Sequence, residues 1–458
     1  MNLKKSLTRV FSANIVQLVS SAIVGFVIPA ILSIDNYAKY KTYTLLISYL
    51  GLLHFGYPDG LYIKYGGKKY SEISKEKRLS EFCTFLLLEL VVFFVLLLIF
   101  IFTKNISILL VSLTLFPYMI STYYKTLYQG VGYFERYTKI IHFYSISYLI
   151  FNIVLVFLVK SDNYIFYCLS TLFAHFISSI TCLFFLFKEK DAISLNIDFR
   201  NYKIIKVGFF VLLGNFALML FFGIDRWCVK IFLNSHDFAY YSFAVNLLNI
   251  ITVLINAISV TFYSYLFKNG NDKNIDKLKD SLLVIGMISS AAFFVLKIII
   301  NIFLKKYIPS LVVISNTFAT FPYMAVINSL YINLYKIKKD EKHYFGVVIS
   351  MLLVGFVLNI VGILIFNSIF AVSLATLLSF IIWFIYSTFD LKRVAINIKN
   401  VISLFIVTSI FLISSHFTNV YYGMLVYTIA IICVIKFIYY DTIVMLIKNI
   451  LKKKGSNL

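Results

Sequence analysis

The sequence predicts an all-α polytopic membrane protein with 14 transmembrane helices, arranged as two parallel-repeat six-helix bundles followed by two C-terminal helices. Three observations predict this fold: the composition, the spacing of long apolar segments, and the placement of lysine and arginine. Of the 458 residues, 61% are hydrophobic and only 14% are charged, whereas about a quarter of the residues in a soluble protein are charged. So little polar surface cannot cover an exterior in water, and lipid must be the solvent.

The apolar segments are long enough to cross a bilayer as helices. A helix needs about 20 apolar residues to span the hydrocarbon core, and only a helix satisfies all of its backbone groups within one segment. In chain order, the predicted spans cover 10–33, 41–62, 82–102, 106–127, 140–159, 164–187, 205–225, 239–266, 281–303, 308–334, 344–366, 368–389, 400–418 and 421–445. The longest outer stretch, 226–238, leaves no room for an extramembrane catalytic domain.

Lysine and arginine indicate the orientation. With the N-terminus in the cytoplasm, 32 of the 42 Lys and Arg residues fall on the cytoplasmic side and 8 on the outer side, while Lys297 and Lys436 lie within spans. Because cytoplasmic loops carry an excess of basic residues, both termini are predicted to be cytoplasmic. The net charge of +22 is spread over short stretches between apolar segments, so it does not indicate a nucleic-acid partner.

An internal duplication relates the fourth span to the tenth. The tetrapeptide Phe116-Pro117-Tyr118-Met119 recurs as Phe321-Pro322-Tyr323-Met324. An offset of 201 also aligns the first two spans with the seventh and eighth, which pairs Asn14 with Asn215. Both matches are six spans apart, an even number, so the two halves have the same orientation. Parallel halves of this kind are typical of transporters that work by alternating access.

The repeat sets the predicted domain boundaries. Residues 1–200 form the N-terminal six-helix lobe, 201–395 the C-terminal six-helix lobe, and 396–458 two additional transmembrane helices with a basic cytoplasmic tail. Pro117 and Pro322 occupy equivalent positions in the two lobes. We expect matched kinks there, acting either as hinges or as static bends.

Several short stretches then resemble a known family. They are Phe55-Gly56-Tyr57-Pro58-Asp59-Gly60 with Lys64-Tyr65-Gly66-Gly67-Lys68-Lys69, Gly223-Ile224-Asp225-Arg226, and Tyr240-Tyr241-Ser242-Phe243-Ala244. Together with the 6+6+2 plan, they resemble the O-antigen and capsule repeat-unit flippases, the polysaccharide branch of the multidrug/oligosaccharidyl-lipid/polysaccharide exporter superfamily. The resemblance implies a flippase that moves undecaprenyl-pyrophosphate-linked oligosaccharides from the inner to the outer leaflet of the bacterial cell membrane. Such a protein serves surface polysaccharide biosynthesis and is not an enzyme.

The resemblance also bears on partners and cofactors. The expected partners are the lipid-linked oligosaccharide, membrane lipids and other polysaccharide-assembly membrane proteins, with the chain itself a monomer. We expect no cofactor. The five cysteines form no CxxC or Cys/His cluster, so no metal site is expected either.

Polar residues inside spans are the candidate substrate-binding groups, because a polar group in a membrane is costly unless it faces a cavity or another helix. Span one offers Asn14 and Gln17, and Asn215 is the repeat partner of Asn14. In span eight, Asn246, Asn249 and Asn256 share one helical face with two serines. The span-eight residues either line a cavity or bond neighbouring helices. Asn14 and Asn215 either line the two lobes of one cleft or cap structurally equivalent bends.

Charged residues within spans complete the candidate list. Lys125 lies on a polar face of span four with Tyr118, near the cytoplasm, where it would first meet an anionic lipid head. Asp225 and Arg226 lie near the outer end of span seven, and Arg226 is either a pyrophosphate ligand or an interfacial anchor. Lys297 is a cavity cation or a snorkelling anchor. Glu89 either pairs with a basic neighbour or binds a coupling cation.

Two other functions remain open from the sequence. A cation-coupled multidrug exporter of the same superfamily would use acidic residues in the N-terminal lobe, where Glu89 is the only deep carboxylate. A membrane glycosyltransferase or polymerase would need catalytic residues on a sizeable outer loop, which the spans do not leave. A basic cavity would favour the flippase and an acidic cavity the drug exporter.

Overall fold

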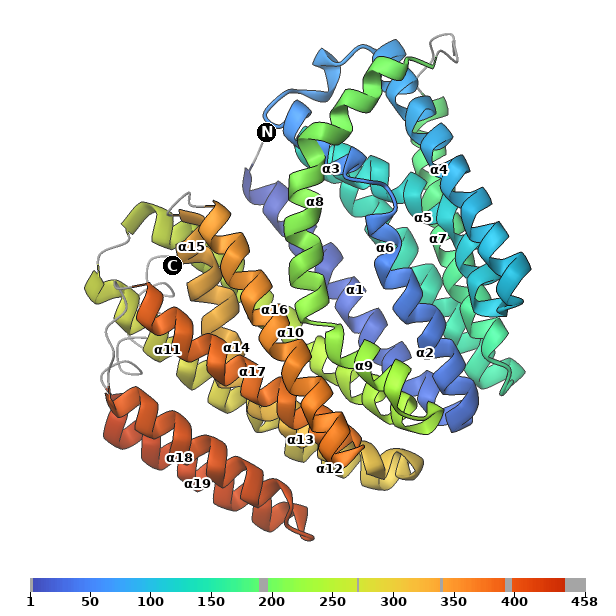
Figure 1. Cartoon of the computed structure of the whole chain (residues 1–458). Coiled ribbons are helices and arrows are strands. Elements are labelled where there is room, and N and C mark those ends of the chain that lie inside the picture. The colour runs from blue at the N-terminus through green and yellow to red at the C-terminus, as the bar shows by residue number, and fades with distance from the viewer. Residues whose placement is uncertain (1–2, 189–196, 270–271, 338–340, 392–397, 441–458) are drawn as a thin grey trace. The chain divides into compact units, whose positions relative to one another are not determined.

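The computed structural model describes residues 3–188, 197–269, 272–337, 341–391 and 398–440. Over these ranges the regular elements are all helices and no strand occurs, so the predicted all-α class is confirmed (Figure 1). The chain divides into two compact units, Met1–Met219 and Leu220–Leu458. The boundary between these units, at 219/220, falls within the helix Lys203–Phe221. The internal repeat predicts a lobe boundary at 200/201 instead, and that boundary stays a prediction.

In the described part of the first unit, seven α-helices are complete and an eighth extends two residues past its end. They are α1 (Leu3–Ile31), α2 (Ile34–Tyr49), α3 (Tyr57–Tyr65), α4 (Lys75–Thr103), α5 (Ile106–Gly130), α6 (Phe134–Val154), α7 (Tyr164–Phe187) and α8 (Lys203–Phe221). Helix α6 packs against α1 and α7, and α5 packs against α4 and α7. Through these contacts, the polar face of α5 is directed toward the interior of the unit.

The second unit holds the remaining helices. They are α9 (Ile224–Phe232), α10 (Ser235–Asn269), α11 (Asp272–Ser290), α12 (Ala292–Phe303), α13 (Leu311–Ala319), α14 (Phe321–Val326), α15 (Ile332–Ile337), α16 (Glu341–Phe366), α17 (Ile369–Asp390), α18 (Ile398–Ser415) and α19 (Val420–Ile438). Helices α18 and α19 run side by side (Figure 1). The Tyr427 hydroxyl donates to the Met287 carbonyl (2.9 Å), and Asn400 donates to Asp280 (2.8 Å). These bonds tie the hairpin to α11.

Ten helices among the described residues are long and apolar enough to cross a membrane, or eleven if one bent pair counts as a single span. The chain is therefore a multi-pass membrane protein. The other predicted spans fall on α2 with α3, on α10 and on α18. The count of fourteen stays a prediction.

The second predicted span, 41–62, is broken rather than continuous. Helix α2 ends at Tyr49, and after a short helical turn the backbone becomes left-handed at Phe55 (φ 51°) and Gly56 (φ 82°). Pro58 then lies in the first turn of α3. Proline is favoured at the start of a helix, because it has no N–H to bond. The His54 ring accepts the Gly56 N–H (3.0 Å), which satisfies the backbone at the break.

The two repeat-equivalent prolines do not produce matched kinks. Helix α5 continues through Pro117, whereas the tenth predicted span is bent by 43° between Ala319 and Phe321. Because Pro322 has no N–H, the Phe318 carbonyl lacks its helical donor, and the Ser290 hydroxyl donates to it instead (2.8 Å). The bend is therefore stabilised by α11, a contact that the tetrapeptide itself does not encode.

Candidate functional site

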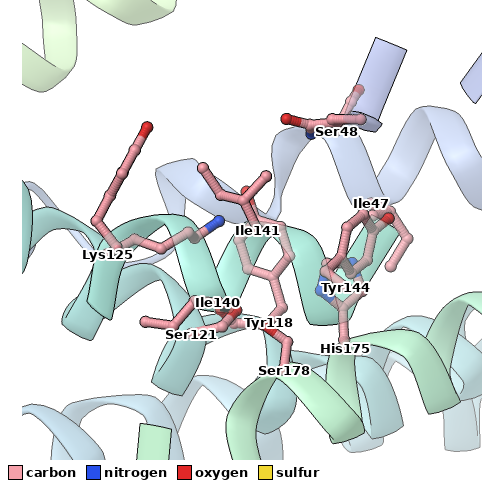
Figure 2. Close-up of a pocket in the computed structure, with 12 residues that line it drawn as sticks. Ile47, Ser48, Tyr118, Ser121, Lys125, Ile140, Ile141, Tyr144, His175 and Ser178 are labelled. Carbon is pink, nitrogen blue, oxygen red and sulfur yellow. Dashed lines mark hydrogen bonds between the residues drawn. The ribbon is translucent and has the colours of Figure 1, made fainter. Parts of the chain in front are cut away.

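A cavity of about 340 Å³ lies inside the first unit. Five helices form its wall: α1, α2, α5, α6 and α7. Its lining consists of Gln17, Ile47, Ser48, Tyr118, Ser121, Lys125, Tyr137, Ile140, Ile141, Tyr144, His175 and Ser178. Figure 2 shows ten of these residues converging from their separate helices. The cavity is near the lower end of the range for small-molecule sites, about 300–1,000 Å³, so it has room for one part of a large ligand.

Helix α5 brings Lys125 into the cavity. Tyr118, Ser121 and Lys125 are spaced by three and four residues, so they share one face of the helix, and all three line the cavity. Ser121 donates its hydroxyl to the Tyr118 carbonyl (2.8 Å). The polar face predicted for span four comprised Tyr118, Thr122, Lys125 and Gln129; of these, Tyr118 and Lys125 line the cavity.

Lys125 has no acidic partner in the cavity. The lining contains no Asp or Glu, and no ion pair of Lys125 occurs among the described residues. A cation at membrane depth is stabilised by an anion or by a water-filled cavity. The charge of Lys125 thus suits the cavity to a negatively charged group.

Aromatic rings form part of the cavity lining. The His175 ring is placed between Tyr118, with ring centroids 5.2 Å apart, and Tyr144, at 4.5 Å. Figure 2 shows Tyr144 and His175 overlapping, with Tyr118 beside them. Tyr144 also stacks on Tyr148 one turn further along α6, with an interplanar angle of 4°. Ser48 and Tyr137 also line the cavity, so it offers both aromatic surfaces and hydroxyl groups.

Asp225 is held within the second unit rather than free. It is 7% exposed and accepts the Tyr241 hydroxyl (2.7 Å) and the Arg226 backbone N–H (2.7 Å). The bond from Tyr241 ties α9 to α10, whereas the bond from Arg226 lies within α9. Arg226 is half-buried, and its Nε has no hydrogen-bond partner within the described part of the chain.

Lys297 contacts backbone carbonyls. Its amino group donates to the carbonyls of Ser415 (2.7 Å) and Phe417 (2.9 Å), at the C-terminal end of α18. A cation at this end of a helix satisfies free carbonyls and complements the helix dipole. The geometry is that of an anchor for the α18–α19 hairpin.

The remaining predicted residues lie elsewhere. Asn14 on α1, Asn215 on α8 and Asn249 on α10 are exposed, and Asn246 is half-buried. The side chain of Asn256 lies outside the described residues. Glu89 is fully buried on α4 and does not line the cavity. Of the predicted site residues, the structure thus brings Gln17 and Lys125 together in one cavity.

The sequence prediction missed Ser48, Tyr137 and Tyr144 as cavity residues. They come from α2 and α6, so no spacing along a single helix connects them to Lys125. His175 on α7 also lines the cavity, with its ring packed against Tyr144. Over the described residues, no group of three or more His, Cys, Asp or Glu side chains could hold a metal ion.

Its many long apolar helices define a multi-pass membrane protein, and a basic cavity lies within the first unit. The chain belongs to the polysaccharide biosynthesis protein family, whose model matches residues 5–270, more than half of its length. This confirms the resemblance to the polysaccharide branch of the exporter superfamily. A comparison with curated protein sequences gives no match.

Solved structures share the fold at low sequence identity. The lipid II flippase MurJ in an inward closed conformation has a TM-score of 0.69 and 16% identity, over 96% of this chain and 99% of that one. An inward-facing multidrug resistance MATE family transporter of the MOP superfamily has a TM-score of 0.55 and 10% identity, over 83% and 98%. A MOP superfamily transporter from Pyrococcus furiosus has a TM-score of 0.51 and 11% identity, over 85% and 96%.

Proposed function

We propose that this protein is a flippase for undecaprenyl-pyrophosphate-linked oligosaccharide repeat units, moving them from the inner to the outer leaflet of a bacterial cell membrane by alternating access. Its product would feed the assembly of a surface polysaccharide such as an O-antigen. The observation that carries the proposal is the cavity around Lys125, which holds a cation and no carboxylate in its lining. Family membership supplies the link to polysaccharide biosynthesis.

The cavity has groups for both polar parts of such a substrate. The Lys125 amino group would pair with a phosphate oxygen, since a charged headgroup crossing the membrane needs a counter-ion inside the protein. Hydroxyls of Ser48 and Tyr137 and the amide of Gln17 would bond the sugar nearest the phosphate. At about 340 Å³ the cavity takes the headgroup and not the whole saccharide, while the polyprenyl chain stays in lipid.

The charge distribution supports the direction of transport. The excess of basic residues predicts that both termini face the cytoplasm. With that orientation, Lys125 lies in the cytoplasmic half of its span. An anionic headgroup made in the cytoplasm would therefore meet the Lys125 amino group early in its passage.

A cation-coupled multidrug exporter is the second candidate, favoured by the fold shared with a MATE family transporter. Its substrates are cationic, and Lys125 would repel them. The sequence also left open a membrane glycosyltransferase or polymerase. The solved structures that share this fold are flippases and transporters, which favours transport over catalysis.

Substitution of Lys125 tests the proposal. In cells whose own copy is deleted, Lys125→Met is expected to leave the lipid-linked repeat unit on the inner leaflet, with surface polysaccharide reduced at least tenfold. The leaflet is read from the protection of the saccharide against a non-permeant oxidant in spheroplasts. Lys125→Arg keeps the charge and should restore most of the transport.

Lys436→Met is the matched control, because it removes a lysine from another apolar helix, on the exposed face of α19. It should transport as the unmodified protein does. If deletion cells still present the saccharide normally on the outer leaflet, or if purified protein in vesicles expels cationic dyes instead, the flippase proposal is wrong.

A further inference from the structure

Four of the five serine and threonine hydroxyls on α7 are satisfied within the helix itself. Each donates to a backbone carbonyl three or four residues earlier, at 2.8 to 3.2 Å, and the four are Ser170, Thr171, Ser179 and Thr181. A serine or threonine in a helix commonly bonds in this way, and the bond leaves no donor unsatisfied at membrane depth. These four side chains therefore need no ligand.

The fifth hydroxyl, that of Ser178, and the histidine one turn before it are different. Ser178 and His175 share a helix face, and both line the cavity. They are 2% and 7% exposed, yet no hydrogen bond of either side chain occurs within the described part of the chain. A buried polar group is costly unless it is hydrogen-bonded. These two side chains are therefore the part of α7 that a ligand in the cavity would complete.

The His175 ring is held by aromatic neighbours from two other helices, Tyr118 of α5 and Tyr144 of α6. Of its two nitrogens, Nδ1 is enclosed by protein, so Nε2 is the one that can face the cavity. The lining has no carboxylate to balance a second cation beside Lys125, which indicates a neutral imidazole with a single N–H. Because an enclosed N–H without an acceptor is especially rare, the proton belongs on Nε2, as a donor into the cavity.

The amino group of Lys125 is near these two side chains. Its positive charge is close enough to interact with the His175 ring. Figure 2 shows the Lys125 side chain extending toward Tyr118, the residue against which His175 packs. Side chains of a helix lean toward its N-terminus, which is the direction of Tyr118 along α5. A phosphate on the Lys125 amino group would therefore place the sugar attached to it beside His175 and Ser178.

The cavity also has an apolar side. Ile140 and Ile141 of α6 line it, one turn before Tyr144. A group bound between these side chains and α7 needs an acceptor for the His175 N–H, a second polar atom for the Ser178 hydroxyl, and an apolar end. An N-acyl amide combines all three, in its carbonyl oxygen, its N–H and its methyl group. A hydroxyl would have to serve both side chains from one oxygen atom, although residues one turn apart are about 5–6 Å apart at Cβ.

We propose that His175 and Ser178 determine the specificity of this cavity by binding an N-acyl group, such as acetamido, on the sugar that carries the diphosphate. The inference rests on the proposed flippase function and on Lys125 holding the phosphate. The Nε2–H of His175 donates to the amide carbonyl, and the Ser178 hydroxyl oxygen accepts the amide N–H. The methyl group packs against Ile140 and Ile141. The preferred cargo is thus a lipid-linked oligosaccharide whose first sugar bears the amide at C2, next to the carbon that carries the phosphate.

The test uses the purified full chain in vesicles with two polyprenyl-diphosphate monosaccharides that differ only at C2, one with an acetamido group and one with a hydroxyl. Both are supplied together, and the ratio of their transport rates is measured. The native protein is expected to prefer the acetamido compound about tenfold or more, because the other compound leaves buried polar groups of the site unpaired. His175→Phe, which keeps a ring but no N–H, and Ser178→Ala should each reduce that preference to roughly threefold or less.

Ser179→Ala is the matched control, because it removes the neighbouring hydroxyl, which bonds its own helix at 2.8 Å, and it should keep the full preference. His175→Gln is the rescue variant, since its amide N–H can take the place of Nε2–H, and it should restore most of the preference. The proposal is overturned if the native protein transports the two compounds equally, or if the preference survives in both His175→Phe and Ser178→Ala.

Binding measurements separate a failure of this inference from a failure of the flippase function. Native protein that transports neither compound refutes the flippase function, and the two compounds are then compared by their binding to the detergent-solubilised protein. Tighter binding of the acetamido compound that is lost in Ser178→Ala supports the specificity site, whereas equal binding of both compounds by the native protein contradicts it. If His175→Phe does not fold, Ser178→Ala decides, because it leaves the aromatic contacts of His175 intact.

Discussion

Glu81, buried on α4, accepts hydrogen bonds from three residues of α3: its carboxylate accepts the Tyr65 hydroxyl (2.7 Å) and the Lys64 amino group (2.6 Å). Besides the bonds from Tyr65 and Lys64, its backbone carbonyl accepts the Tyr57 hydroxyl (2.9 Å). The amino group of Lys64 remains partly open to solvent, with 32% of its side chain exposed. Glu81 therefore connects α3, which follows the broken second span, to α4.

Glu81→Ala is expected to destabilise the protein. It leaves the Tyr65 hydroxyl without its acceptor, which costs about 1–3 kcal/mol, while Lys64 can turn to water. Thermal unfolding of the detergent-solubilised protein, followed by tryptophan fluorescence, measures the effect. Glu76→Ala on the exposed first turn of the same helix is the control and should change stability by a few tenths of a kcal/mol. Equal effects of the two substitutions would contradict the role given to Glu81.

At the scale of elements, α8 is packed unusually closely at its start. A Cβ atom built on Gly208 would overlap the backbone of Gly60 in α3 and that of Gly56 in the break before α3. Small residues let two helix backbones approach in a membrane, where packing drives association. A Cβ on Gly214, six residues further along α8, would meet nothing within 4 Å.

This contrast predicts opposite effects of the same substitution on one helix. Gly208→Ala should destabilise the first unit by about 1–3 kcal/mol, because the backbone of α3 has to shift. Gly214→Ala should be neutral or stabilising by up to about 1 kcal/mol, because alanine favours helix more than glycine does. Melting temperatures of the two variants in detergent test this. A Gly208→Ala variant as stable as the native protein would disprove the close contact.

At the scale of the whole molecule, the orientation can be tested directly. The excess of basic residues on one side predicts cytoplasmic termini, and the turn between α18 and α19 is then outside. An epitope inserted in that turn, after Phe417, should bind antibody in intact spheroplasts. An epitope at the C-terminus should bind only after permeabilisation. The reverse pattern would invert the predicted topology and with it the direction of transport.

Much of the fold could be predicted from the sequence because each segment in lipid must meet the demands of the membrane by itself. Each span needs its own apolar length and its own satisfied backbone, so a stretch such as 106–127 could be placed without knowing its neighbours. The short motifs near Gly56 and Asp225 also indicated the family, and the family model that matches residues 5–270 confirms it. Lys125 and Tyr118 could be found because helical spacing puts them on one face.

The tertiary structure decided what each buried polar group does. Glu81 lies just before the predicted third span and Glu89 within it, yet both are buried on α4. The carboxylate of Glu81 accepts bonds from Tyr65 and Lys64, whereas that of Glu89 has no hydrogen-bond partner among the described residues. The sequence left Lys297 as a cavity cation or an anchor, and in the structure its amino group bonds the backbone carbonyls of Ser415 and Phe417. Tyr144 became a cavity residue only because α6 packs between α1 and α7.

Fold class and family thus followed from the sequence alone, since hydropathy and charge act on each segment separately. The cavity, the break after α2 and the partners of buried charges required the structure. Those features depend on contacts between residues far apart in the chain, and for a polar group in lipid the energy depends on which partner it meets.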